Sequence, residues 1–184
     1  RRPAEPPVIT ARALAKSFGS HAALRGIDLT VGRGELFALI GPDGAGKTTF
    51  FRLVAGLIRP TSGSVERDAK AAFGLVPQRF SLYEDLTVDE NLTLRARLYS
   101  VPGAEARTRA ADLLERVGLA RFRGRLGGAL SGGMKQKLAL SCALIHRPSV
   151  LFLDEPTTGV DAVSRKEFWE LLRDLQKAGI SILV

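Results

Sequence analysis

The chain has 184 residues, 45% of them hydrophobic and 25% charged, which fits one well-buried globular domain and excludes a disordered chain. Its formal net charge of +8 at pH 7 indicates an anionic partner, a class that includes nucleotides, anionic lipid surfaces and nucleic acids. The single cysteine, Cys142, excludes an internal disulfide. No apolar run approaches the roughly 20 residues that a membrane-spanning helix needs, so any membrane role is expected to come through a partner.

The N-terminal 31 residues predict a flexible leader followed by antiparallel strands. Residues 1–7 are rich in proline, as linkers are. Residues 8–15 and 27–31 have the composition of β-strands, and turn-forming residues at 18–21 and at Arg25-Gly26 separate them. Phe18 is expected in the first turn, where its ring either packs on the sheet or offers a flat surface to a base.

A glycine-rich loop at residues 41–49 matches the phosphate-loop pattern G-x-x-x-x-G-K-[ST]. The apolar run 36–40 predicts a strand buried on both faces before the loop, and residues 49–57 predict an amphipathic helix after it. In this context Lys47 is expected to reach the β- and γ-phosphates of a nucleotide and Thr48 to bind Mg²⁺. A glycine-rich turn that merely caps a helix is the alternative. The loop consists of Gly41, Pro42, Asp43, Gly44, Ala45, Gly46, Lys47, Thr48 and Thr49.

The middle of the chain predicts two more strands and then a helical insert. The strands, at residues 64–66 and 71–76, end before Gln78, which is thereby placed where ligand sites of open α/β sheets collect. Thr87 and Glu90 form a capping box that predicts a helix to about Tyr99, and residues 103–117 predict another. The insert is rich in arginine, which indicates a solvated basic face or, alternatively, contact with anionic lipid or nucleic acid.

Two later segments carry residues that suit phosphate and metal chemistry. Ser131-Gly132-Gly133 precedes an apolar helix expected at about 138–145, and it is either a helix-starting loop with Ser131 as N-cap or a second anion site. Asp154 and Glu155 follow an apolar strand, where two carboxylates are costly unless a cation or a reaction uses them. In a phosphate-loop enzyme the first aligns the Mg²⁺ shell and the second can accept a proton from attacking water.

The last helix is predicted from a second capping box, formed by Ser164 and Glu167. Its apolar stripe is expected to pack in the core, and Gly179 is expected to end it. The chain stops within an apolar run, residues 180–184, that has the character of a core strand. A fragment of a longer polypeptide is therefore expected.

Taken together, these motifs resemble the nucleotide-binding domain of ATP-binding cassette (ABC) transporters over residues 8–184. The phosphate loop, the Gln78 loop and a signature sequence at residues 130–136 occur in the family's order. Asp154 resembles the metal-aligning aspartate, with Thr48 and Gln78 as the other metal-site residues, and Glu155 resembles the catalytic glutamate. The further nucleotide-site residues that the resemblance implies are Phe18 on adenine, Gln78, Ser131, Gly132, Gly133, Gln136 and Asp161.

The resemblance implies an α/β P-loop NTPase with a mostly parallel core sheet, an N-terminal antiparallel β subdomain and a helical subdomain at about residues 85–145. It implies an ATPase that uses ATP and Mg²⁺, works as a head-to-tail dimer with a second such domain, and drives an integral-membrane permease from the cytoplasmic face of the membrane. Residues 77–87 and Gly159-Val160-Asp161 look most like drug-export or polysaccharide-export cassettes. No nucleic-acid partner is expected.

The sequence departs from the family's pattern at three points. Asp43 stands where asparagine is usual, and Lys137 stands where arginine is frequent. The family's switch histidine would follow the terminal strand, so the chain is expected to bind Mg-ATP and to hydrolyse it poorly. A soluble ABC ATPase acting on ribosomes or DNA is the alternative function, supported by the net charge alone. A non-hydrolysing regulatory cassette is a third, against which Lys47 and Glu155 argue.

Overall fold

A computed structural model describes residues 6–78 and 81–184. The chain divides into two compact units. The first holds the described residues up to Leu75 together with Ser149–Asp154 and Leu175–Val184, and the second holds Val76–Pro148 and Glu155–Asp174. The predicted helical subdomain falls within the second unit. Arg79 and Phe80, which belong to the segment used for the subfamily prediction, lie outside the described residues.

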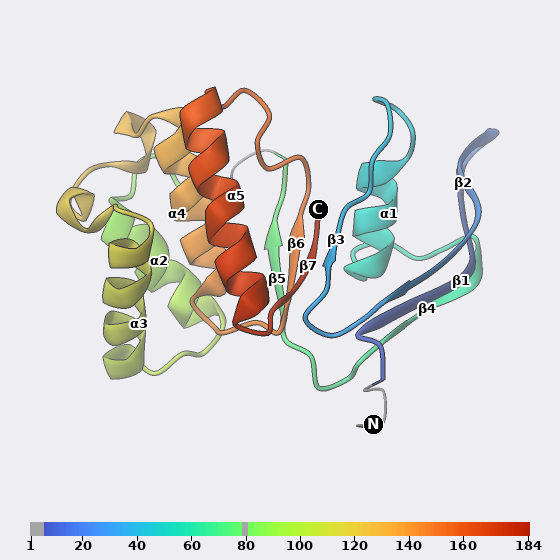
Figure 1. Cartoon of the computed structure of the whole chain (residues 1–184), viewed down its shortest axis with the longest axis horizontal. Coiled ribbons are helices and arrows are strands. Elements are labelled where there is room, and N and C mark those ends of the chain that lie inside the picture. The colour runs from blue at the N-terminus through green and yellow to red at the C-terminus, as the bar shows by residue number, and fades with distance from the viewer. Residues whose placement is uncertain (1–5, 79–80) are drawn as a thin grey trace. The chain divides into compact units, whose positions relative to one another are not determined.

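An antiparallel sheet of order β2-β1-β4 forms one part of the first unit (Figure 1). Its strands are β1 (Ile9–Phe18), β2 (His21–Val31) and β4 (Ser62–Arg67). The predicted break at Arg25-Gly26 is wrong, because β2 runs through it with a shift of register and a positive φ of 84° at Gly26. Phe18 ends β1 opposite His21 and does not lie in the turn itself.

A second sheet of the first unit has the order β3-β7-β6-β5, with β7 parallel to both β3 and β6. Its strands are β3 (Leu36–Phe37), β5 (Phe73–Val76), β6 (Val150–Leu153) and β7 (Ser181–Leu183). All four residues of β6 are buried. The predicted doubly buried strand at 36–40 is wrong, because only two residues are strand and Ile40 is 92% exposed. Beyond the last strand residue of β3, the Leu39 N–H donates to the carbonyl oxygen of Val184 at 2.6 Å.

Helix α1 (Lys47–Val54) packs its apolar side into the core of the first unit. Phe50, Phe51, Leu53 and Val54 are buried, whereas the predicted helix end at Leu57 is wrong. Gly56 follows the helix with a φ of 76°, and this turn leaves Leu57 61% exposed. The core thus fixes the start of α1 at the end of the phosphate loop. Its fully buried large side chains include Phe50, Phe152, Ile9 and Leu14.

The second unit is built on helices α2 (Val88–Leu98), α3 (Gly103–Arg116) and α4 (Gly132–Leu144), which contact one another (Figure 1). Two short 3-10 turns, η1 (Ala120–Phe122) and η2 (Gly127–Ala129), connect α3 to α4. The capping box of Thr87 and Glu90 is confirmed at the start of α2. The predicted start of α4 is wrong by six residues, because Ser131 caps the helix directly and Gly132 is already its first residue.

Helix α5 (Ala162–Lys177) begins in the second unit. The predicted capping box of Ser164 and Glu167 is wrong. The Asp161 carboxylate instead accepts from the backbone N–H groups of Val163 and Ser164, at 3.1 and 2.9 Å. Glu167 pairs with Lys137 of α4 at 2.6 Å. Of the predicted apolar stripe, Phe168 and Leu172 are fully buried, and Gly179 ends the helix segment with a φ of 96°.

Candidate functional site

The phosphate loop in the first unit ends in a bare helix N-terminus. Gly46 is the N-cap of α1, in a left-handed conformation with φ 87°, and no side chain of the described residues caps the helix. The first turn also holds no acidic residue. Because the first N–H groups of a helix lack intrahelical partners and carry the positive end of the helix dipole, this end suits an anion.

Gly46 is required here for a close approach as well as for its backbone angle. A Cβ atom at this position would lie 2.5 Å from the carbonyl oxygen of Ala23 and 2.9 Å from a methyl carbon of Leu24. Ala23 and Leu24 belong to β2, which pairs with β1. The β1–β2 hairpin therefore lies directly against the phosphate loop, and it carries Phe18, a residue that is 52% exposed.

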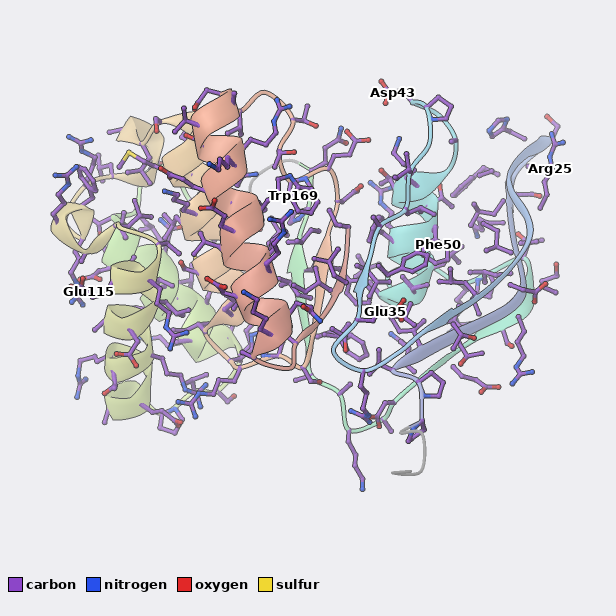
Figure 2. All side chains as sticks on the ribbon, in the orientation of Figure 1. Arg25, Glu35, Asp43, Phe50, Glu115 and Trp169 are labelled. Atoms are coloured by element: carbon purple, nitrogen blue, oxygen red, sulfur yellow. The ribbon has the colours of Figure 1, made fainter. Side chains whose placement is uncertain are left out.

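Lys47 turns back onto its own loop. Its ammonium donates to the carbonyl oxygens of Gly41 and Pro42, at 2.8 and 3.0 Å, and lies 3.9 Å from the carboxylate of Asp43. Asp43 stands at the outer end of the loop (Figure 2), and its side chain is fully exposed. An exposed pair of this kind is worth little in water. The backbone carbonyls, and not Asp43, hold the ammonium beside the loop.

Thr48 and Asp154, two residues predicted to bind a metal, are in contact in the first unit. The Thr48 hydroxyl lies 3.2 Å from a carboxylate oxygen of Asp154, which directly follows the buried strand β6 and is 6% exposed. The sequence separates these residues by more than a hundred positions, and the sheet brings them together. Hard oxygen donors at the N-terminus of a phosphate-binding helix fit Mg²⁺, which keeps several waters and binds through few protein ligands.

Glu155, the first residue of its segment in the second unit, has a backbone φ of 50°. This left-handed conformation is strained for a residue with a side chain, and such strain clusters at functional sites. Gln78 donates its amide N–H to the Glu155 carboxylate at 3.0 Å, and the Thr158 hydroxyl lies 3.5 Å from the same oxygen. Gln78 and Glu155, which were predicted separately as a metal-site residue and the catalytic residue, are therefore in contact. Thr158 was not predicted, although its place three residues after Glu155 is the signal that could have found it.

The signature segment presents part of the predicted set and buries the rest. Ser131 and Gly132 are exposed, and the Ser131 hydroxyl accepts from the Met134 N–H at 3.4 Å. Gly133 is buried against Ser164 of α5, whose hydroxyl would lie 2.6 Å from an added Cβ. Gln136 is 0% exposed, and its amide atoms have no hydrogen-bond partner among the described residues. Its side chain thus faces the interior of the unit.

Asp161 serves its own chain as the N-cap of α5. The hydrogen bond from the Ser164 N–H, reinforced by the Ser164 hydroxyl, holds the pKa of the Asp161 carboxyl below its usual range. The carboxylate is therefore charged wherever the cap is formed. As the pH falls through that lowered pKa, the cap loses its charge and weakens.

The described residues contain neither a membrane-spanning helix nor a cluster of side chains typical of a metal site. Within residues 6–78 and 81–184, no helix has the length and apolar character needed to cross a membrane. No group of three or more His, Cys, Asp or Glu side chains in the same ranges could hold a metal ion.

Comparison with known proteins agrees with this arrangement. The ABC transporter family matches residues 24–158. The probable multidrug ABC transporter ATP-binding protein YbhF of Escherichia coli (strain K12) is 48% identical over 96% of this chain. The daunorubicin resistance ATP-binding protein DrrA2 of Streptomyces coeruleorubidus is 41% identical over 96%, and the Nod factor export ATP-binding protein I of Ralstonia nicotianae is 38% identical over 97%. This chain spans 32% of the first relative, 58% of the second and 59% of the third.

A solved structure shares the fold. The structure of cbiO1 from Clostridium perfringens, described as part of the ABC transporter complex cbiONQ, matches 97% of this chain and 78% of its own, with a TM-score of 0.87 and 30% identity. The predicted fold class is confirmed. The predicted resemblance to drug-export and polysaccharide-export cassettes is also confirmed, because the relatives are named for multidrug transport and Nod factor export. The chain belongs to the ABC transporter family and corresponds to an ATP-binding domain of that family.

Proposed function

We propose that this domain binds Mg-ATP on the phosphate loop and the N-terminus of α1. The observation that carries the proposal is the pairing of Thr48 with the buried Asp154 at 3.2 Å, directly at a helix N-terminus that no described side chain caps. The backbone N–H groups and Lys47 would hold the phosphates, and Thr48 and Asp154 would hold the metal. Phe18, on the hairpin that contacts Gly46, would offer its exposed ring to the base.

Hydrolysis is assigned to Glu155. It follows the metal-site Asp154 in the chain, and a carboxylate at that position can accept the proton of a water that attacks the γ-phosphate. Gln78 and Thr158, at 3.0 and 3.5 Å, would orient the carboxylate. Mg²⁺ would neutralise charge that develops on the phosphates.

The assembled protein is proposed to be an exporter ATPase. Ser131 and Gly132 are exposed at the start of α4, where they could complete the ATP site of a second copy in a head-to-tail dimer. ATP binding would then close the dimer and hydrolysis would open it. The names of the relatives, which concern multidrug transport, daunorubicin resistance and Nod factor export, support a partner permease and a position at the cytoplasmic face of the membrane. No nucleic-acid partner is proposed.

The test is the Glu155→Gln substitution in the protein assembled with its permease. Removal of a general base should slow ATP turnover by at least ~100-fold while ATP binding is retained. The variant should accumulate as an ATP-bound dimer, which light scattering after size exclusion would detect. Glu115→Gln is the matched control, because Glu115 is an exposed glutamate on α3 (Figure 2). Normal hydrolysis by Glu155→Gln would remove Glu155 as the base, and absence of Mg-ATP binding by the unsubstituted protein would remove the proposed function itself.

A further inference from the structure

The exposed ring of Phe18 is accompanied by a cation from its own strand. The ammonium of Lys16 lies 5.1 Å from the centroid of the Phe18 ring. Lys16 and Phe18 are two residues apart in β1, so their side chains leave the same face of the strand. This distance is within the range of a cation–π interaction, in which the ring's negative face attracts the charge.

A second contact fixes the position of that ammonium. Lys16 also donates to the backbone carbonyl oxygen of Arg59, at 2.8 Å. The segment that carries this carbonyl is itself bound to β1, because the Thr61 N–H donates to the Ala15 carbonyl at 2.9 Å and the Thr61 hydroxyl accepts from the Ser17 N–H at 3.0 Å. Strand β1 therefore holds the backbone of Lys16, and the Arg59 carbonyl holds its ammonium. The hydrogen bonds of Thr61 join these two segments.

This arrangement gives the two faces of the Phe18 ring different surroundings. One face carries the Lys16 ammonium, yet the residue as a whole remains 52% exposed. A cation over one face draws π-electron density toward itself, which leaves the opposite face better suited to an electron-rich partner. The hairpin that carries the ring lies against Gly46 of the phosphate loop through Ala23. A flat group bound at this ring would therefore be near bound phosphates.

We propose that Lys16 is a positioning residue that fixes Phe18 as a one-sided stacking platform and favours a purine base over a pyrimidine base. The proposal rests on the proposed function, because it concerns the base of the nucleotide whose phosphates the loop binds. Lys16 acts through the ring: it orients Phe18 and covers the face that the base does not use. The larger and more electron-rich purine gains more from such a platform than a pyrimidine does.

Two simpler roles for Lys16 make different predictions. A purely structural tie between β1 and the Arg59 segment would affect folding stability and would treat all ligands alike. A general attraction of the positive charge for phosphates would strengthen inorganic tripolyphosphate as much as ATP, because it depends on charge and is screened by salt. Only a role through the ring depends on which base is present.

The experiment measures the dissociation constants of Mg-ATP, Mg-UTP and Mg-tripolyphosphate by calorimetry at one salt concentration. Lys16→Met should weaken ATP binding about three- to tenfold, weaken UTP binding less, and leave tripolyphosphate binding within about twofold. Lys16→Arg should restore the preference for ATP, since a guanidinium can occupy the same place over the ring. Phe18→Ala should abolish the preference. Lys166→Met is the control, because Lys166 is an exposed lysine on α5.

The outcomes separate the proposal from the function on which it rests. An equal loss for all three ligands in Lys16→Met would overturn the role through the ring. So would a Lys16→Met variant that keeps the normal ratio of ATP to UTP affinity while Phe18→Ala loses its preference for ATP. If the unsubstituted protein binds tripolyphosphate and prefers no nucleotide, the base platform is wrong and the phosphate site stands. If it binds none of the three, the proposed function fails first and the role of Lys16 fails with it.

Discussion

Helices α1 and α4 both begin after glycine-rich loops, yet their N-termini differ. Gly46 starts α1 in a left-handed conformation and, as a glycine, supplies no side chain to cap the helix. Ser131 starts α4 in an extended conformation, with φ −66° and ψ 163°, and its hydroxyl accepts from the Met134 N–H. The N-cap residue of α1 therefore makes no side-chain cap, whereas the N-cap residue of α4 makes one.

The difference suggests why the two ends would contribute unequally to one nucleotide. The bare end of α1 is accompanied by Lys47 and by the Thr48–Asp154 pair, so it can bind phosphate and metal within a single chain. The end of α4 has exposed Ser131 and Gly132, and Lys135 in its first turns is paired to Glu84 at 2.7 Å. In the proposed dimer it would be the weaker half, which adds affinity only after the first half has bound.

The largest effect is expected from a side chain added at Gly46, the N-cap of α1. Gly46→Ala places a Cβ 2.5 Å from the Ala23 carbonyl at a φ of 87°, and it should cost about 2–4 kcal/mol of unfolding free energy and abolish ATP binding. Urea unfolding and calorimetry measure the two quantities. Gly44→Ala is the matched control: its φ is 81° but no atom of the described residues lies within 4 Å of the added Cβ, so only about 1 kcal/mol is expected. Equal losses would show that close approach to Ala23 does not matter.

A smaller effect is expected at the start of α4. Gly133→Ala directs a Cβ to 2.6 Å from the Ser164 hydroxyl, and it should lower the unfolding free energy by about 1–2 kcal/mol. The neighbouring Gly132→Ala meets no described atom within 4 Å and should be neutral or stabilising by up to ~1 kcal/mol, because alanine is the better helix former. Thermal unfolding of the two variants compares them directly. Gly132→Ala being the less stable of the pair would contradict the packing of Gly133 on Ser164.

The smallest effect is expected at the charge in front of α1. Asp43 is fully exposed, so Asp43→Asn should leave stability unchanged. Removal of one negative charge near the bound phosphates should lower the dissociation constant of ATP about two- to fivefold at low salt, and the gain should shrink as salt rises. Titrations at two salt concentrations test this. A gain that persists undiminished at high salt would point to the asparagine amide as a new donor rather than to the lost charge.

The sequence predicted the fold class and the Thr87 capping box correctly, but it misplaced the ends of several secondary-structure elements. The loop that ends in Lys47 and Thr48, the Asp154-Glu155 pair and the Thr87 capping box all follow local patterns that physical chemistry restricts to few residue types. Errors arose where local signals compete. Ser164 and Asp161 are both residue types that favour N-cap positions. In the structure Asp161 caps α5, and Ser164 lies against Gly133. Leu57 is apolar but lies beyond Gly56, whose left-handed turn follows the end of the helix.

By itself, the sequence determined which chemical groups are available for the proposed nucleotide site. They are glycines before a helix, one lysine, one hydroxyl and two adjacent carboxylates. Only the tertiary structure decided which groups are in contact. It paired Thr48 with Asp154, Gln78 with Glu155 and Lys16 with Phe18, and it turned Gln136 into the interior. The physical reason is that residue type fixes what a side chain can bind, whereas contacts between distant segments depend on sheet order and close packing, which no local pattern encodes.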